Sequence, residues 1–253
     1  MNFYFQTNMN RYQTPVLLII YAILAALVII FFDGNGDSGD STQHYLFAKF
    51  APQHPAHFFE HWAKPIYVLL ACPFAQFGFT GIKIFNALVT LGTLFFTIKT
   101  IEKLGIHNSI IGGILLICSP LCFVLTFSGL TEPLFGLLTI LSIYLVLEDK
   151  LIIACIGASF LPFVRSEGLI ILGVFGLFCL YKREWRCIPL LLLGHVVYSI
   201  AGFFFYKDFL LAKLFCIIAS LTTLQSQKHS LGVRTDLFDG VGLIVALLWG
   251  QEP

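Results

Sequence analysis

The chain has 253 residues, of which 58% are hydrophobic and only 11% carry a charge, and its mean hydropathy is +0.87. A soluble domain carries about 25% charged residues and could not bury this much apolar surface in one core. The formal net charge of +1 excludes an electrostatic basis for nucleic-acid binding. The composition therefore predicts an all-α, polytopic membrane protein whose apolar surface faces lipid.

Apolar segments of helical length recur along the chain. The first, 15–32, has no cleavage signature after it, so we expect a membrane span and not a signal peptide. Segment 65–79 is shorter and rich in aromatic residues, which predicts an interfacial or re-entrant helix. We expect further spans at 81–101, 109–126, 130–147, 151–164, 168–181, 187–206, 209–224 and 241–249. One membrane-embedded domain of about eight to nine spans, covering residues 1–253, follows from this pattern.

The charged residues sort unevenly between the two ends of these spans. Counting alternate span ends places most of the basic residues on the side of Arg11, which predicts a cytoplasmic N-terminus. The acidic residues of the opposite, outer side are Asp33, Asp37, Asp40, Glu60, Glu132, Glu167 and Asp208. Carboxylates that gather on one side of a membrane bundle indicate an extracytoplasmic site.

The acidic motif DGNGDSGD, residues 33–40, directly follows the first span. A carboxylate at the membrane surface can act as a general base on an acceptor hydroxyl, and the glycines let the backbone approach a substrate closely. Asp37 and Asp40 are therefore the candidate catalytic residues. The alternative interpretations are a hydrophilic turn that ends the helix and a weak cation site.

The histidine-rich segment 54–64, HPAHFFEHWAK, supports three interpretations. On a helix, His57 and His61 would share a face beside Glu60, which favours a metal site. An amphipathic helix with its aromatic residues among lipid headgroups explains the same pattern. In the third interpretation, His61 and Lys64 contact an anionic headgroup.

A polar turn, SGLTEP at 128–133, separates two of the predicted spans. Thr131 can cap the following helix, and Glu132 would lie in its first turn, where the helix dipole favours a negative charge. This structural role accounts for the residue types. The functional alternative is that Glu132 faces the same outer cavity as the acidic motif.

A second polar turn, FVRSEG at 163–168, places two charges between short apolar helices. A charge at that depth is costly unless it is paired or binds a ligand. The planar fork of Arg165 suits phosphate oxygens, so Arg165 is the candidate contact for a lipid phosphate. The alternative is a structural ion pair between Arg165 and Glu167.

The remaining polar and sulfur-containing residues of the apolar segments have simpler explanations. His195 stands alone in its segment, which favours a hydrogen-bonding residue inside the bundle over a ligand. The seven cysteines lie almost entirely in apolar segments without paired spacing, so we expect small buried residues and neither disulfides nor zinc ligands.

In their order along the chain, these motifs resemble those of the GT-C class of glycosyltransferases, which use polyprenyl-phosphate sugars. The acidic first outer loop with interfacial helices is similar to that of protein O-mannosyltransferases and of the aminoarabinose transferase for lipid A. The segments SPLCFVLTFSGLTEPLFGLL and FVRSEG resemble the Ser-Glu hairpin and the Arg-x-x-Gly turn of GPI mannosyltransferases. The resemblance covers residues 15–206.

The resemblance implies transfer of a sugar, with inversion, from a polyprenyl-phosphate donor to an acceptor hydroxyl on the extracytoplasmic face. Asp40 or Asp37 would be the general base, with Asp40 preferred because it leads directly into the following helix. Arg165 would contact the donor phosphate. The further candidate substrate contacts are Glu167, His44, Lys64, His61 and Glu132.

This chemistry needs no metal, because Arg165 and Lys64 can stabilise the phosphate leaving group. A divalent cation, Mg²⁺ or Mn²⁺, bridging Asp37, Asp40 and the phosphate is the alternative. The expected partners are the lipid-linked donor and membrane lipids. We expect a multi-pass protein of the bacterial plasma membrane, or of the endoplasmic reticulum in a eukaryote.

Two other functions fit the same composition. A transporter or flippase of lipid-linked substrates would also have short broken helices and intramembrane charges. In a non-catalytic membrane accessory subunit, the outer carboxylates would be incidental. The segment after Asp208 is polar and turn-rich and the class commonly has longer chains, so we expect a fragment, a frameshifted product or a minimal member.

Overall fold

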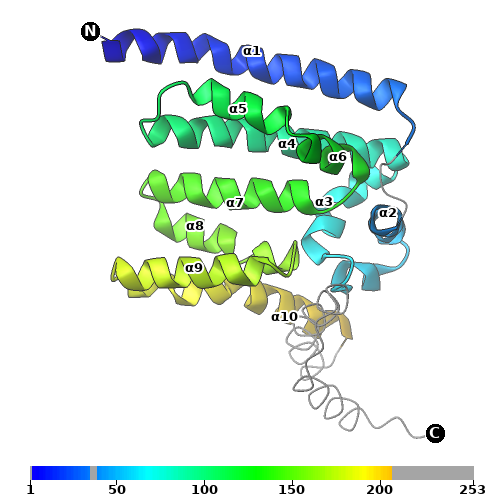
Figure 1. The fold of residues 1–253 in the computed structure, drawn as a ribbon. Coiled ribbons are helices and arrows are strands. Elements are labelled where there is room, and N and C mark those ends of the chain that lie inside the picture. The colour runs from blue at the N-terminus through cyan, green and yellow to red at the C-terminus, as the bar shows by residue number, and fades with distance from the viewer. Residues whose placement is uncertain (1, 35–38, 207–253) are drawn as a thin grey trace, which may run out of the picture.

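The computed structural model describes residues 2–34 and 39–206. Within these ranges the chain is built of helices and has no β-strand, which confirms the predicted all-α class (Figure 1). Asp37, Asp208 and the expected spans at 209–224 and 241–249 lie outside the described residues.

The helical elements follow one another with short connections. In chain order they are α1 (Asn2–Phe31), α2 (Asp40–Phe50), η1 (Pro55–Phe59), α3 (Pro65–Ala75), α4 (Phe79–Lys103), α5 (Ser109–Ile117), α6 (Pro120–Ser128), α7 (Glu132–Leu147), α8 (Leu151–Ala158), η2 (Leu161–Phe163), α9 (Gly168–Tyr181), η3 (Trp185–Cys187), η4 (Pro189–Leu192) and α10 (Leu193–Tyr206).

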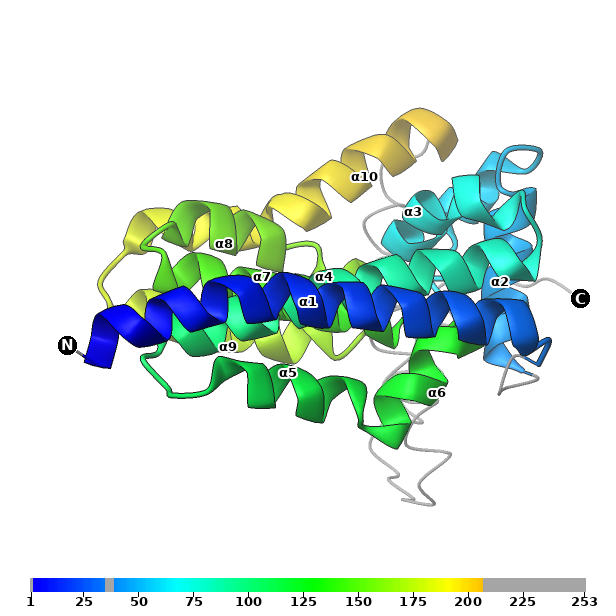
Figure 2. The ribbon, with the colours of Figure 1, turned by 90° about the horizontal axis from the view of Figure 1, so that it is seen from above.

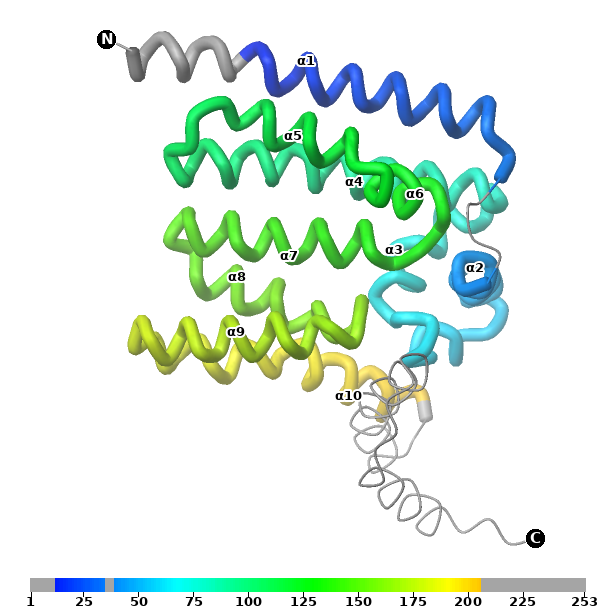
Figure 3. The backbone as a smooth tube through the Cα atoms, viewed as in Figure 1, coloured from blue at the N-terminus to red at the C-terminus, as the bar shows by residue number. Residues whose placement is uncertain are grey.

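The longer helices lie side by side in one bundle, and short elements cover one of its ends. α2, η1 and α3 gather where α1 finishes and α4 begins, and α2 lies across the bundle axis (Figures 1 and 2). The α6–α7 turn and the start of α9 lie at this same end, which we call the layered end (Figure 3). The backbone therefore brings the acidic, histidine-rich and two polar-turn motifs to one end of the bundle.

A buried apolar cluster at the layered end joins α2 and α3 to the longer helices of the bundle. Ala48 of α2 and Tyr67 and Ala71 of α3 pack with Ile82 and Phe85 of α4 in one buried cluster. The cluster continues into Leu134 of α7 and Val164 before α9. Burial of this apolar surface fixes the elements that carry the charged residues.

α1 packs along α4 with one face only. Leu17, Tyr21 and Ala25 are buried against α4 and recur every fourth residue, as one helix face requires. Its other face exposes large apolar side chains such as Ile19 and Ile23. An exposed face of this composition is typical of a helix that meets lipid.

The expected number of spans is not supported in the part of the chain that the structure describes. Three segments are long and apolar enough to cross a membrane, Tyr12–Phe31, Phe79–Lys103 and Trp185–Phe205. α7 is apolar but has only 16 residues, so it rises about 24 Å and falls short of a hydrocarbon core of about 30 Å. α8 and α9 are shorter still.

The predicted span at 109–126 is broken. α5 and α6 bend by 60° relative to each other, and only if this bent pair counts as one span does the described chain have four. Pro120 starts α6 and has no N–H to continue the helix from α5, while the Ser119 hydroxyl accepts a hydrogen bond from the Cys122 N–H at 3.5 Å. The proline and the serine cap together account for the break.

The described cysteines are free thiols, as expected. Cys155, Cys179 and Cys187 are buried where α8 and α9 meet the chain before α10, and the Cys155 and Cys179 sulfurs lie 3.6 Å apart. Cys118 is exposed and Cys72 and Cys122 are partly buried, so the expectation of buried thiols holds for three of the six described cysteines.

Candidate functional site: a charged cluster at the layered end

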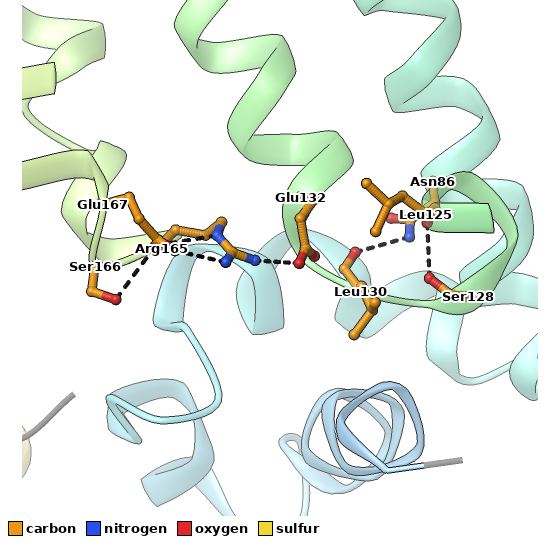
Figure 4. A network of polar contacts seen from close by, with 8 residues as sticks. All are labelled: Asn86, Leu125, Ser128, Leu130, Glu132, Arg165, Ser166 and Glu167. Carbon is orange, nitrogen blue, oxygen red and sulfur yellow. Dashed lines mark hydrogen bonds and ion pairs between the residues drawn. The ribbon is translucent and has the colours of Figure 1, made fainter. Parts of the chain in front are cut away.

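Arg165 is the centre of a charged cluster at the layered end (Figure 4). Its Nε and Nη2 donate to the two carboxylate oxygens of Glu167, at 3.2 and 2.8 Å, and its Nη1 pairs with Oε1 of Glu132. The side chains of Arg165, Glu132 and Glu167 are 24%, 30% and 34% exposed. The guanidinium is therefore held from two directions and remains partly open to a ligand.

Local structure places the two carboxylates. Glu132 starts α7 and is followed by Pro133, and an acidic side chain is favoured in the first turn by the helix dipole. Thr131 makes no side-chain capping hydrogen bond, so the predicted cap is wrong. A Cβ at Gly168 would lie 2.3 Å from the carbonyl carbon of Leu161, so only glycine fits this tight turn.

The electrostatic balance keeps Arg165 charged. Burial lowers the pKa of the guanidinium, but the hydrogen bond with Glu167 and the charges of Glu132 and Glu167 outweigh it, so the pKa is raised. The predicted alternative of a structural ion pair between Arg165 and Glu167 is therefore confirmed. A third partner, Glu132, joins this pair to another helical hairpin.

Lys64 lies beside this cluster in a strained backbone conformation. Its φ of 64° is positive, although the residue is not glycine and precedes proline. Burial and the nearby charge of Arg165 lower the pKa of its ammonium group, and the charge of Glu167 opposes them. Within the described ranges Lys64 forms no ion pair, and its ammonium group lies within electrostatic reach of both Arg165 and Glu167.

His44 connects α2 to the cluster. The residue is only 6% exposed, and its ring stacks on Trp62 at 5.1 Å and meets Tyr67 edge-on at 5.6 Å. Burial lowers the pKa of His44 to about 4. The charge of Asp40 raises this pKa, and the charge of Arg165 lowers it. His44 is therefore neutral at pH 7, and Asp40 and Arg165 both lie within electrostatic reach of its ring.

Asp40 occupies the first turn of α2, where a carboxylate is favoured by the helix dipole. Its side chain is exposed, one helical turn before His44. An exposed carboxylate at the edge of a partly buried charged cluster can take a proton from a bound hydroxyl.

The predicted helical histidine face is wrong. η1 ends at Phe59, and Glu60 has an extended backbone, so no helix joins His57 to His61. His57 packs against Phe47 at 4.8 Å, whereas His61 is buried near Lys64 and His195. No group of three or more metal-ligating side chains that could hold a metal ion occurs among the described residues.

His61 nevertheless lies close to the cluster. Burial, followed by the charge of Lys64, lowers the pKa of His61 to about 4. Neither ring nitrogen has a hydrogen-bond partner within the described chain. His195 was predicted to form a hydrogen bond inside the bundle, but its Nδ1 has no hydrogen-bond partner among the described residues. Its ring packs on Phe163 at 4.8 Å.

Two polar residues of the site were missed by sequence analysis. The Tyr67 hydroxyl donates to the Gly129 carbonyl at 2.9 Å, and Asn86 Nδ2 donates to the Leu130 carbonyl at 3.0 Å. Both side chains are fully buried. The signal for Asn86 was its polarity within the apolar segment 81–101, where an amide is costly unless it has partners.

Lys83 is a third polar residue whose position differs from expectation. It lies near the start of the expected span 81–101, but it is only 3% exposed, and its Nζ donates to the Phe32 carbonyl at 2.6 Å. This bond satisfies a carbonyl just beyond the end of α1, which has no helical partner. Lys83 therefore fixes the start of the acidic motif against α4.

The predicted site residues thus fall into two groups. Of these residues, Asp37 lies outside the described ranges. Contacts or electrostatic interactions link the others at the layered end: Asp40, His44, His61, Lys64, Glu132, Arg165 and Glu167. No protein-family model matches the chain, and no similar protein is found among curated proteins or solved structures.

Proposed function

We propose that the protein is a membrane glycosyltransferase that moves a sugar from a polyprenyl-phosphate donor to an acceptor hydroxyl on the extracytoplasmic face. The observation that supports it best is the approach of Lys64 to Arg165. The charge of Arg165 acts on the Lys64 ammonium group, Lys64 has a positive φ, and carboxylates hold the guanidinium in place. Such an arrangement favours a phosphate ligand, since an anion relieves the repulsion between the two cations.

The donors of Arg165 leave room for this ligand. A guanidinium has five N–H groups, and the described partners engage its Nε, Nη1 and Nη2 once each. One N–H remains on each terminal nitrogen. A phosphate at the open side of the cluster would accept these hydrogen bonds and contact the Lys64 ammonium.

The proposed reaction is a single displacement at the anomeric carbon. The acceptor oxygen forms a bond to that carbon as the bond to the phosphate oxygen breaks, and the leaving phosphate takes the electron pair. Asp40 accepts the proton of the acceptor hydroxyl. Arg165 and Lys64 stabilise the charge that develops on the leaving phosphate.

A metal-dependent version uses the same residues. Oxygen ligands such as Asp40 and a donor phosphate suit Mg²⁺ or Mn²⁺. Loss of transfer on addition of a chelator, with recovery on addition of either ion, would select this version. Transfer that is unchanged by a chelator would select stabilisation by Arg165 and Lys64.

The test is transfer of a radiolabelled hexose by the purified full-length protein. The donor is a polyprenyl-phosphate hexose, and the acceptors are hydroxyl-bearing peptides, glycans and lipids. Asp40→Asn and Arg165→Ala should each lower the rate at least about 100-fold. Two variants are matched controls. Asp33→Asn removes an exposed carboxylate that directly follows α1, and Glu148→Gln removes a carboxylate at the opposite end of α7. Equal rates in Asp40→Asn and Asp33→Asn would reject Asp40 as the base.

A flippase of lipid-linked sugars is the second candidate, and the broken α5–α6 pair favours it. Broken helices line substrate pathways in transporters. A flippase would move a fluorescent lipid-linked sugar across vesicles without changing its chemistry. An accessory subunit would do neither.

A further inference from the structure

Two buried oxygen atoms beside the α6–α7 turn have no partner in the part of the chain that the structure describes. Asn86 is fully buried, and its Oδ1 accepts no hydrogen bond. Glu132 uses Oε1 for Arg165, and its Oε2 is buried and unpartnered. Since an unpaired buried acceptor is costly, the two atoms indicate a ligand that donates hydrogen bonds.

Both atoms belong to one location. The Tyr67 phenol interacts with the side chains of Asn86 and Glu132. Tyr67 and Asn86 also bind successive carbonyls of the turn, those of Gly129 and Leu130. Figure 4 shows Asn86, Leu130, Glu132 and Arg165 following one another along this edge of the cluster.

The charges around this location decide the class of ligand. Glu132 and Glu167 are balanced by Arg165 and the nearby Lys64, so there is no surplus negative charge to attract a metal cation. An anion would be repelled by two unpaired acceptor oxygens. A neutral hydroxyl group donates a hydrogen bond without adding charge, and a sugar presents several such groups on adjacent carbons.

We propose that Asn86, Glu132 and Tyr67 form a hydroxyl-recognition subsite for the sugar of the donor, beside the phosphate contacts of Arg165. This inference rests on the proposed function, because it assigns the sugar end of the same ligand. Asn86 Oδ1 and Glu132 Oε2 each accept a hydrogen bond from a sugar hydroxyl. Asn86 is the specificity-determining residue, and it takes no part in proton transfer.

The test compares the binding of two lipids to the full-length protein in nanodiscs. One is a polyprenyl-phosphate hexose, and the other is the same polyprenyl phosphate without the sugar. The wild type should bind the first at least about tenfold more tightly, because a polar subsite discriminates strongly against a ligand that lacks its hydroxyl groups. Asn86→Leu should abolish this preference and leave binding of the sugar-free lipid unchanged.

Asn86→Asp separates recognition from turn structure. It keeps an acceptor oxygen and loses the amide that donates to the Leu130 carbonyl. It should retain the preference for the sugar-bearing lipid, whereas a purely structural role predicts that Asp and Leu variants lose it together. That shared loss would overturn the subsite.

Wild-type measurements keep the proposal testable even if Asn86→Leu fails to fold. Donor analogues that lack one hydroxyl should bind the wild type about tenfold more weakly at one or two positions of the ring. Equal binding of every deoxy analogue would overturn the subsite and leave the phosphate site standing. Failure to bind either lipid would overturn the subsite and the proposed function together.

Discussion

Arg165 and Glu132 belong to different helical hairpins, and the ion pair between them joins the start of α7 to the turn before α9. Glu167 holds the same guanidinium through two hydrogen bonds. One cation therefore fixes the relative position of two turns and remains partly exposed toward a ligand. The same contacts contribute to stability and to the proposed site.

Removing the guanidinium should destabilise the layered end. In Arg165→Ala, Glu132 and Glu167 would be left without their shared cation. Because these side chains are 24% to 34% exposed, solvent screens part of the effect, and we expect a loss of about 1–3 kcal/mol. Thermal unfolding in detergent measures it. Lys103→Met, which breaks the more exposed pair with Glu148, should lower the unfolding temperature less than Arg165→Ala does; equal losses in the two variants would contradict the account.

The stability of the fold should depend on pH through His44. Its folded pKa of about 4 lies below the ordinary value of 6.5, so between these values the unfolded chain binds a proton that the folded chain does not. Stability is therefore full above pH 6.5 and falls as the pH decreases toward 4, by about 3 kcal/mol for this group. His44→Phe should remove this part of the dependence.

His61 has the same downward shift, to about 4, so His44→Phe should keep about half of the combined pH dependence. Unfolding measured at pH 4.5 and pH 7.5 gives the comparison. If the variant and the wild type lose the same stability between these pH values, His44 is not buried as a neutral ring.

The α6–α7 turn should depend on Gly129. Its φ is +78°, and a Cβ there would lie 3.1 Å from Ile82 and Phe79. Gly129→Ala should therefore cost about 1–2 kcal/mol through backbone strain and crowding. Gly136→Ala is the matched control, since nothing lies within 4 Å of its Cβ and α7 is helical there. A neutral Gly129→Ala would show that the turn has another conformation.

The end of α1 should loosen without Lys83. The Phe32 carbonyl accepts from Lys83 Nζ, and the Phe32 N–H donates to the Val28 carbonyl at 2.9 Å. In Lys83→Met we expect faster hydrogen exchange at the Phe32 amide, because the last turn of the helix frays. Lys49→Met, in α2, is the control and should leave this amide unchanged. Unchanged exchange in Lys83→Met would mean that the bond does not hold the end of α1.

Sequence patterns predicted the helical class and the grouping of motifs, because alternating helices return the acidic motif and the two polar turns to one end. The contact between Glu132 and Arg165 is a tertiary one that no local spacing specifies. Asn86 and Tyr67 were missed because each is a single polar residue inside an apolar segment, and such a segment is typical of a buried core helix.

Two predictions failed for identifiable reasons. Hydropathy reports apolar composition and not helix length, so α7 to α9 were counted as spans although they are short. The i, i+4 spacing of His57 and His61 implies a shared face only on a continuous helix, and η1 ends between them. No local sequence signal predicts the positive φ at Lys64.

The central claim is that the charged cluster transfers a sugar from a lipid phosphate, and hexose transfer by the purified full-length protein tests it most directly. The account predicts measurable transfer by the wild type and by Asp33→Asn, and a rate at least about 100-fold lower in Asp40→Asn. Absence of transfer by the wild type with every acceptor, or equal rates in the two variants, would contradict it.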